Sequence, residues 1–301
     1  MEQAVVDVSD LSRSYGLKKA LDGVSFSATP GRVYGLVGSN GAGKTTLIKH
    51  LLGLLRATSG SVRVFGLDPV RDPVGVLSRV GYLSEERELP EWMTIGELLR
   101  YTQAFHPTWD DAYARELLDN FALDPTKKIK ELSKGMRAQA GLIAAVAFRP
   151  ELLILDEPSS GLDVVVRRDI LDAVVRTVAD DGRTVIFSSH LLDEVERMSD
   201  HVTLILQGRV KLSGVLDDVR RDYQRSRVRF AQSFDQPPVL DTALAMEGGG
   251  RSWSVIHSGS PEQFRHSVSA RGGEVVESRD ATLEEIFLAR AGRGPSQAEA
   301  A

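Results

Sequence analysis

The chain has 301 residues, of which 42% are hydrophobic and 26% charged, as is typical of a globular protein with room for about two domains. Its 37 basic and 42 acidic residues give a net charge of −5, which argues against a nucleic-acid partner because phosphate contacts need a basic excess. The absence of cysteine excludes disulfide frameworks, cysteine-ligated metals and thiol nucleophiles, and six histidines do not favour a multi-histidine metal site.

The sequence offers no segment for membrane insertion or secretion. Its longest apolar stretch covers residues 141–148, far short of the ~20 residues that span a bilayer. The N-terminal run MEQAVVDVSD lacks the basic and apolar regions of a signal peptide. We therefore expect the chain to lie on the cytoplasmic side and to reach a membrane only through a partner.

Up to about residue 215, short β-rich runs alternate with helical segments. The runs that predict strands are Val5 to Val8, Val33 to Val37, Val62 to Phe65, Leu152 to Leu155, Val185 to Ser188 and Val202 to Leu206. The segments that predict helices are 43–54, 94–105, 110–121, 135–148, 164–180 and 191–199. Several strands are continuously apolar, as expected when both faces are covered. The alternation predicts an α/β fold with a mostly parallel core sheet.

Two stretches interrupt this alternation. Residues 85–132 are helix-rich and contain no convincing strand, so we predict a helical insertion there. Residues 216–227 become strongly charged, and we place a linker in them. The predicted division is therefore a first domain over 1–220, a small α+β domain over 221–291 and a disordered tail over 292–301.

The small C-terminal domain is predicted from local signals. The runs RVRF and SWSVI alternate as strands do. Ser260 followed by Pro261 predicts a helix start, because serine caps helices and proline suits their first position. Thr282 and Glu285 form a capping-box pattern before a last amphipathic helix over 283–290.

A phosphate-binding loop follows the second predicted strand. The pattern is Gly38-Ser39-Asn40-Gly41-Ala42-Gly43-Lys44-Thr45, and Thr46 follows it. Its glycines let successive backbone N–H groups point at phosphate oxygens. Lys44 adds a positive charge for the β- and γ-phosphates, and Thr45 offers a hydroxyl to Mg²⁺ at the start of a helix. An apolar strand before the loop and an amphipathic helix after it provide the expected context, so we predict that residues 38–46 bind a nucleotide.

A second chemical signal is the strand Leu152 to Leu155, which ends in two carboxylates. Asp156 stands where a strand tip would meet the Mg²⁺ near the phosphate loop. Glu157 is then placed to polarise an attacking water. Alone, such a pair is usually a strand running into a polar turn, but the phosphate loop upstream favours the functional interpretation.

Together these segments resemble the nucleotide-binding domain of ATP-binding-cassette (ABC) proteins, a P-loop NTPase fold. The resemblance covers residues 4 to about 215. Besides the phosphate loop it rests on six elements in the family's order: Tyr15, Glu85 in the Q-loop position, Leu132-Ser133-Lys134-Gly135-Met136 in place of LSGGQ, Asp156-Glu157, Ser160-Gly161-Leu162-Asp163 as the D-loop, and His190 as the switch histidine.

The resemblance implies a role for each of these elements. Tyr15 would stack on adenine, and His190 would contact the γ-phosphate and help to hold Glu157 and the water. Two cassettes would dimerise head to tail with ATP between them, so that Ser133 and Gly135 meet the γ-phosphate bound by the other cassette. Asp163 would position that opposing site. ATP would thus hold the closed dimer together, and hydrolysis would release it.

Some positions depart from the family pattern, and some have simpler interpretations. Glu85 stands where many members have Gln; its carboxylate can still contact Mg²⁺ or water, but it cannot donate a hydrogen bond when ionised. Lys134 and Met136 replace Gly and Gln of LSGGQ, which predicts a working but slower site. Tyr15 could be a plain surface aromatic. Ser133 could be a helix cap, and we expect it to combine that role with the phosphate contact.

The resemblance also implies a membrane partner. A single cassette without membrane spans implies a separate multi-span permease subunit, which the helical insertion would meet. Leu89, Pro90, Trp92 and Met93 are either an exposed docking patch or the insertion's own core. A second cassette, in a homodimer or a heterodimer, is the other partner.

The run GYLSEERELPEWMTIGELL and the C-terminal run ATLEEIFL resemble bacterial two-component exporter ATPases. We therefore expect an ATPase subunit that uses ATP and Mg²⁺ to drive export. The alternative is a soluble, non-transport cassette ATPase that acts on a cytosolic assembly, and a permease-bound sensor is a third interpretation. The sequence does not indicate the cargo.

Overall fold

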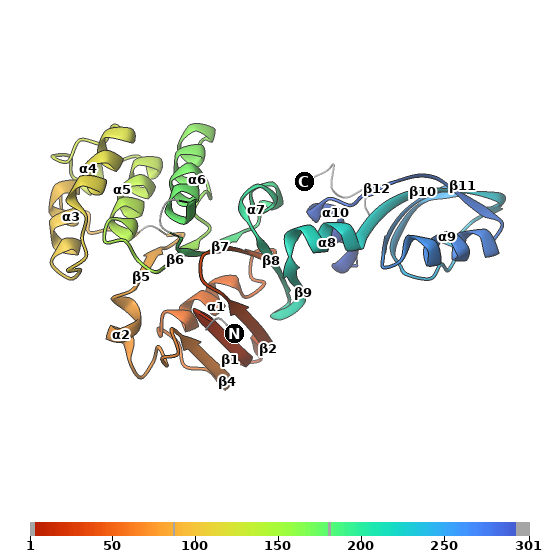
Figure 1. Ribbon diagram of the computed structural model, residues 1–301, viewed down its shortest axis with the longest axis horizontal. Helices are drawn as coiled ribbons and strands as arrows, with labels where there is room; N and C mark the ends of the chain where they lie inside the picture. The colour runs from red at the N-terminus through yellow and green to blue at the C-terminus, as the bar shows by residue number, and fades with distance from the viewer. Residues whose placement is uncertain (1–3, 87, 180–181, 293–301) are drawn as a thin grey trace. The chain divides into compact units, whose positions relative to one another are not determined.

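The computed structural model describes residues 4–86, 88–179 and 182–292, and the chain divides into two compact units (Figure 1). The first unit comprises the described residues up to Leu191 together with Met198–Leu212. The second comprises Leu192–Arg197 and the described residues from Ser213 onward. Within the described residues, no helix combines the length and the apolar character needed to cross a membrane. The tail predicted to be disordered lies outside the described residues except for Gly292.

A mostly parallel sheet forms the centre of the first unit, which confirms the predicted α/β fold. Among the described residues it has six strands in the order β5-β6-β7-β3-β8-β9. Their bounds are β3 (Val33–Val37), β5 (Val80–Leu83), β6 (Leu152–Asp156), β7 (Thr184–Ser189), β8 (His201–Leu206) and β9 (Arg209–Val215, of which Arg209–Leu212 belong to this unit). The pairs β5/β6, β6/β7, β3/β7 and β3/β8 are parallel. Every residue of β3, β6 and β7 is buried, as their apolar sequences predict.

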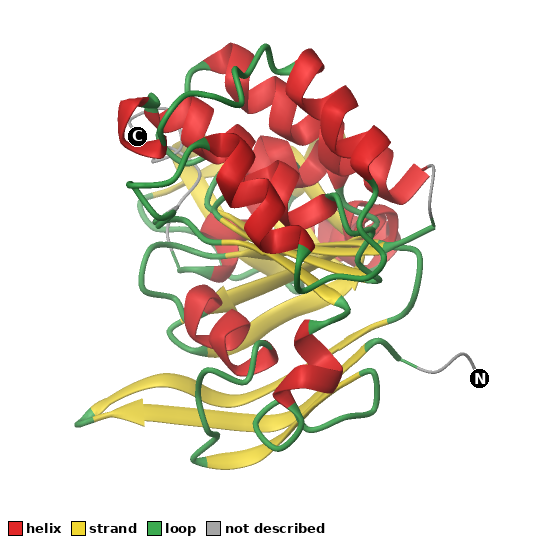
Figure 2. Cartoon of the chain, turned by 90° about the vertical axis from the view of Figure 1, so that its left-hand side faces the viewer, coloured by secondary structure: helices red, strands yellow, loops and turns green. Residues whose placement is uncertain are grey.

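A separate antiparallel sheet lies beyond helix α1 (Lys44–Leu51), at the bottom of Figure 2. Its three described strands, in the order β2-β1-β4, are β1 (Val6–Tyr15), β2 (Lys18–Ala28) and β4 (Ser59–Val64). Leu47, Ile48 and Leu51 of α1 are fully buried between the two sheets. The short helix α2 (Pro73–Leu77) precedes β5. The run that predicted a strand from Val62 thus belongs to this second sheet, which no local sequence signal separates from the first.

Helices cover the other face of the parallel sheet (Figures 1 and 2). They are α3 (Ile95–Gln103), α4 (Asp111–Asn120), the 3₁₀ helix η1 (Ile129–Glu131), α5 (Lys134–Val146) and α6 (Val164–Ala179). Side chains cap their starts: Thr94 forms a capping box with Glu97, and Asp110 accepts from the Tyr113 N–H. The residues proposed either as a docking patch or as the core of the insertion do not behave alike. Trp92 is 71% exposed, as a docking patch requires, whereas Met93 is only 7% exposed and belongs to the core.

The described residues of the second unit form a three-stranded antiparallel sheet, with α9 (Pro261–Ala270) packed against one face and α10 (Leu283–Arg290) bonded to one end of the other. The other elements of this unit are α7 (Leu192–Met198, of which Leu192–Arg197 belong to this unit), α8 (Leu216–Asp222), β10 (Tyr223–Phe234), β11 (Ala243–Ser258) and β12 (Gly273–Asp280). The strands are ordered β11-β10-β12. Phe230, Trp253 and Phe264 form the core between the sheet and α9. The capping box of Thr282 and Glu285 is confirmed.

The linker expected over 216–227 is wrong, because this segment is helix α8 followed by the start of β10. Its charges are numerous, but Leu216, Val219 and Tyr223 are buried and fix the backbone. The linker prediction relied on charge density alone and overlooked apolar residues that are spaced for burial on one side of the segment.

Candidate active site

A cavity of about 340 Å³ opens at the carboxyl ends of the parallel strands β3 and β6, where ligands bind in open α/β sheets. Its lining joins segments that are distant in sequence, namely the end of β1, the start of β2, the phosphate loop and the residues that follow β5 and β6. The lining residues are Tyr15, Lys18, Ala20, Asn40, Gly41, Ala42, Gly43, Lys44, Thr45, Thr46, Glu85 and Glu157. Most of the residues predicted to bind nucleotide therefore face one space.

The phosphate loop needs its glycines for steric reasons. A Cβ added to Gly38 would lie 2.4 Å from the Ile205 carbonyl oxygen. Gly43 has φ +118°, and a Cβ there would lie 2.6 Å from the Ala20 carbonyl oxygen. The Ala42 N–H donates to the Ser39 carbonyl oxygen at 3.0 Å and tightens the turn. The loop is thus fixed against β2 and β8 before α1 begins at Lys44, with the helix N-terminus facing the cavity.

Lys44 is held in place by two contacts. Its side chain is only 5% exposed. The ammonium donates to the Gly38 carbonyl oxygen at 2.6 Å and lies 2.9 Å from Glu157 Oε1. The lysine charge is therefore fixed between the phosphate loop and the acidic end of β6.

Glu157 connects Lys44 to His190. His190 Nδ1 lies 2.7 Å from Glu157 Oε2, and the His190 backbone N–H donates to the same oxygen at 3.3 Å. The backbone of Glu157 has φ +49°, a left-handed conformation that is costly for a residue with a side chain. The Glu157 carboxylate is thus held in a line of three ionisable side chains by a strained turn.

Ser188 on β7 connects the two acidic residues at the end of β6. Its hydroxyl donates to Asp156 Oδ1 at 2.6 Å and accepts from the Glu157 N–H at 2.9 Å. Asp156 is 1% exposed and Ser188 is fully buried. Both carboxylates therefore take their positions from a neighbouring strand.

The charges around Glu157 determine its ionisation. Burial raises the pKa of the Glu157 carboxyl, but the Lys44 charge, the Lys44 contact and His190 together outweigh burial, so the net pKa lies below its usual value. Nearby, burial and the charges of Asp156 and Glu86 raise the pKa of Tyr82 to about 12. Glu157 is thus a carboxylate at neutral pH and is able to accept a proton or a hydrogen bond.

Seven predicted site residues are absent from the lining of this cavity: Gly38, Ser39, Asp156 and His190, whose contacts with the site are described above, and Ser133, Gly135 and Asp163. Ser133 caps α5 by accepting from the Met136 N–H at 3.2 Å, and Asp163 Oδ1 accepts from Val165 N–H and Val166 N–H at 3.0 Å each. Gly135 is buried, and a Cβ on it would lie 3.0 Å from Val166 Cγ2. The capping role expected for Ser133 is confirmed. In this chain Ser133, Gly135 and Asp163 instead form the starts of α5 and α6.

Three residues of this region were not expected from the sequence. Lys18 and Ala20 on β2 line the cavity, and Ser188 holds both carboxylates. None lies in a recognisable motif, since each acts through strand pairing rather than through local spacing. For Lys18 and Ala20, the only available signal was that they follow closely after Tyr15, which was predicted to contact the nucleotide.

Comparisons with known proteins agree with this geometry. Residues 21–160 match the family model described as "ABC transporter". The chain is 34% identical to the daunorubicin/doxorubicin resistance ATP-binding protein DrrA of Streptomyces peucetius, over 95% of this chain and 92% of that protein. It is 32% identical to the bacitracin transport ATP-binding protein BcrA of Bacillus licheniformis, over 96% of this chain and 98% of that protein.

A solved structure titled as the ATP binding subunit of an ABC transporter has 32% sequence identity with this chain and a TM-score of 0.66. The match covers 72% of this chain and 92% of the solved one.

Proposed function

The chain belongs to the ABC transporter family as an ATP-hydrolysing, nucleotide-binding subunit, and we propose that it drives export through a separate membrane-spanning permease. The names of two relatives support this direction, since DrrA is a drug-resistance protein and BcrA a bacitracin transport protein. The single observation that carries the catalytic part is the line of contacts from Lys44 through Glu157 to His190 at the nucleotide cavity.

In this proposal each member of the line has one task. Lys44 binds the β- and γ-phosphates and balances the charge that develops on the leaving group. Glu157 orients water for in-line attack on the γ-phosphate and accepts its proton. His190 holds the Glu157 carboxylate at 2.7 Å and offers its ring to the γ-phosphate. Tyr15, 47% exposed at the rim of the cavity, stacks on the adenine.

Mg²⁺ is the metal that the nearby donors fit. Thr45 and Glu85 line the cavity with hard oxygen atoms, and the Asp156 carboxylate lies at the end of β6 beside Glu157. No group of three or more His, Cys, Asp or Glu side chains in the described part of the chain is arranged to hold a metal by itself. This suits an ion that is bound by one or two protein oxygens together with substrate phosphates. Bound Mg²⁺ would neutralise phosphate charge.

A second cassette completes the site in this proposal. Ser133, Gly135 and Asp163 do not line the cavity. They lie at the starts of α5 and α6 instead. They would meet the ATP held by the partner cassette. Because one chain carries both halves of such a site, we propose a homodimer with two competent sites.

The permease would dock on the helical part of the first unit. Three large aromatic side chains are exposed there, with Trp92 71%, Tyr101 54% and Phe105 62% exposed, and the rings of Tyr101 and Phe105 pack edge to face at 5.1 Å. Exposed apolar groups of this size favour protein contact. This docking would place the chain on the cytoplasmic face of the membrane.

Co-purification from native membranes tests the proposal. The tagged chain should retain a multi-span protein after detergent solubilisation, and reconstitution with it should stimulate ATP hydrolysis. Trp92→Ala should weaken retention, whereas Val239→Ala, a 75% exposed site in the second unit, should not. Recovery of soluble partners alone would contradict the transport role and favour a cytosolic assembly.

A further inference from the structure

Helix α9 covers one face of the sheet of the second unit, whereas α10 covers only one end of the other face, where Tyr223 and Ile256 are buried. Along β10, Ser226, Val228 and Phe230 are buried on the side of α9. The alternate positions, Arg225, Arg227 and Arg229, therefore point to the other face. β10 is the central strand, so these arginines run down the middle of the sheet.

Part of this face is hollowed into a cavity of about 250 Å³. Its lining residues come from all three strands: Arg225, Arg227, Ser254, Glu277 and Arg279. The strand register explains the grouping, because Arg227 pairs with both Ser254 and Glu277 and Arg225 pairs with Arg279. The volume is below the ~300–1,000 Å³ of pockets for drug-sized ligands, which favours a small group.

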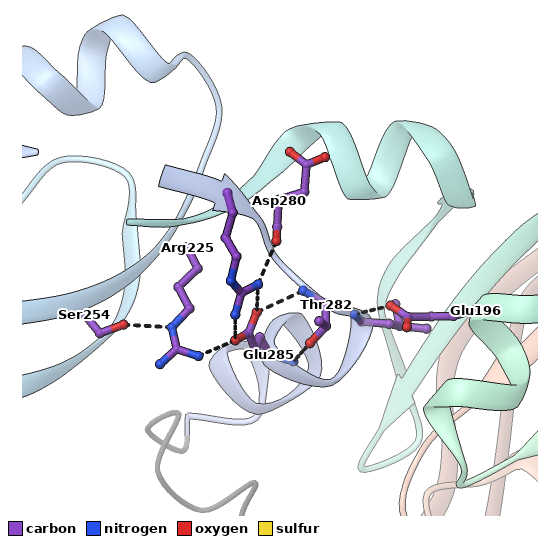
Figure 3. A network of polar contacts seen from close by, with 8 residues as sticks. Glu196, Arg225, Ser254, Asp280, Thr282 and Glu285 are labelled. Atoms are coloured by element: carbon purple, nitrogen blue, oxygen red, sulfur yellow. Dashed lines mark hydrogen bonds and ion pairs between the residues drawn. The ribbon is translucent and has the colours of Figure 1, made fainter. Parts of the chain in front are cut away.

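Two of the arginines are fixed before any ligand arrives. Arg225 donates from Nε to Ser254 Oγ at 2.9 Å and from Nη1 to Glu285 Oε1 at 2.5 Å. Arg279 donates to both oxygens of Glu285, at 2.9 and 2.6 Å. Figure 3 shows Glu285 between these donors, with its Oε2 also accepting from the Thr282 N–H. A binding group held in this way is preorganised.

Arg227 is different, because its partner is weak. Its guanidinium lies 3.6 Å from Glu277, with the two side chains 64% and 62% exposed. Exposed pairs of this kind contribute little, and a better acceptor can displace the carboxylate. Among the described residues Arg227 has no other ion pair, so its planar set of N–H donors is available to a ligand.

The charges around the cavity favour an anion. Three guanidinium groups face the two carboxylates of Glu277 and Glu285, which leaves one positive charge uncompensated. Guanidinium groups bind phosphate oxygens through paired hydrogen bonds. We propose that this cavity binds a phosphate group, with Arg227 as the principal donor and Arg225, Arg279 and Ser254 as supporting donors.

The bound group would also be connected to α7. The Leu283 N–H, at the start of the helix that carries Glu285, donates to Glu196 Oε1 on α7 at 2.6 Å (Figure 3). In the sequence, α7 begins directly after Leu191, next to His190. A phosphate that draws Arg225 or Arg279 away from Glu285 would therefore disturb the helix start that contacts α7.

Isothermal titration of the full chain with inorganic phosphate tests the site. Lys44→Ala should remove binding at the cassette and leave one site per chain. In that background, Arg227→Gln should weaken phosphate binding by about tenfold or more, since a charge-assisted hydrogen bond is lost. Arg229→Gln is the matched control, because it lies on the same strand and face outside the cavity, and it should leave the affinity unchanged.

Glu277→Gln supplies a change of opposite sign. It removes the competing carboxylate, so phosphate should bind several-fold more tightly. If Lys44→Ala does not fold, the same comparisons in the otherwise unchanged chain still separate an Arg227-dependent site from the cassette. Equal phosphate affinity with and without Arg227→Gln would overturn the proposal.

Vesicles distinguish two sources of the phosphate group. Arg227-dependent sedimentation with phosphatidic acid vesicles, and none with phosphatidylcholine vesicles, would assign a lipid headgroup. Arg227-dependent binding of inorganic phosphate without sedimentation would assign a soluble phosphate compound. Sedimentation that Arg227→Gln does not reduce, together with unchanged phosphate affinity, would count against this cavity.

Discussion

Each unit of the molecule contains a buried carboxylate paired with basic side chains, and the two carboxylates are held in different ways. Glu157 has Lys44 on one oxygen, His190 on the other, and a left-handed backbone. Glu285 lies in a regular helix and accepts four hydrogen bonds, from Arg225, from both terminal nitrogens of Arg279 and from the Thr282 N–H.

The difference separates a reactive group from a structural one. In both cases burial raises the carboxyl pKa, but the basic and hydrogen-bonding partners lower it by more, so the net pKa lies below its usual value and both groups are ionised at neutral pH. Glu157 faces a cavity and has partners that a nucleotide can also use. Glu285 has its oxygens fully occupied within its own unit. A strained, sparsely bound carboxylate suits chemistry, and a saturated one suits stability.

Apart from replacing Glu157 itself, the largest effect is expected from Lys44→Ala. It removes the charge beside Glu157 and the phosphate contact, so turnover should fall by about 10³-fold, close to 4 kcal/mol of transition-state stabilisation. Steady-state ATP hydrolysis measures it. Lys49→Ala, on the exposed face of the same helix, is the control and should retain normal turnover. Normal ATP hydrolysis by Lys44→Ala would contradict the reactive role given to the contacts between Lys44 and Glu157.

Glu285→Ala should act on stability instead. It leaves Arg225 and Arg279 without their shared acceptor and breaks the capping box, which should lower the free energy of unfolding by about 3 kcal/mol. Trp253 in the core of the second unit reports this unfolding when Trp92 and Trp109 are replaced by Phe. Nucleotide affinity should not change. A loss of ATP binding without a loss of stability would contradict the structural role.

A third prediction concerns pH and the second unit. His257 is 1% exposed, bonded to Ser226 and stacked on Phe264 at 3.6 Å, and burial lowers its pKa from 6.5 to about 4. Below pH 6.5 the unfolded chain therefore binds a proton that the folded chain does not bind until about pH 4. This stability contribution is full above pH 6.5 and declines toward pH 4, by about 2 kcal/mol at pH 5.

Chemical unfolding followed through Trp253 between pH 5 and 7.5 measures this decline. His257→Gln should flatten the dependence on pH. His266→Gln, an exposed histidine on α9, should leave it as it is. An equally steep dependence in the His257→Gln chain would rule out His257 as its source.

Ser188→Ala should have the smallest of these effects. It removes the hydroxyl that contacts Asp156 and the Glu157 backbone, which is worth about 1–1.5 kcal/mol, so turnover should fall by about tenfold. Its thermal unfolding should change much less than that of Glu285→Ala. Normal turnover would show that Asp156 and Glu157 keep their positions without the hydrogen bonds from Ser188 on β7.

The comparison also shows what the sequence could reveal. The phosphate loop and the pair Asp156-Glu157 are local patterns, so both were predicted to lie together at strand ends. The parallel sheet followed from continuous apolar runs. Lys18 and Ser188 could not be found in this way, because strand pairing brings them to the site from positions with no motif of their own.

The second unit was harder to predict because its organisation is long-range. Glu285 was recognised as half of a capping box, but its partner Arg225 lies 60 residues away in the chain. The charged stretch after Val215 suggested a linker, whereas the buried positions Leu216, Val219 and Tyr223 make it a helix and a strand. Strand β12 is mostly exposed, so it gave little hydrophobic signal.

The most direct test of the catalytic claim compares single-turnover ATP hydrolysis by two separate variants, Glu157→Gln and Glu285→Gln. Both changes remove one carboxylate charge and keep the shape of the side chain. Glu157→Gln should lose 10²–10⁴-fold in the hydrolysis rate while still binding ATP and forming an ATP-dependent dimer. Glu285→Gln should hydrolyse at nearly the normal rate. Equal rates for Glu157→Gln and the unaltered chain would contradict the assignment of Glu157 as the group that activates water.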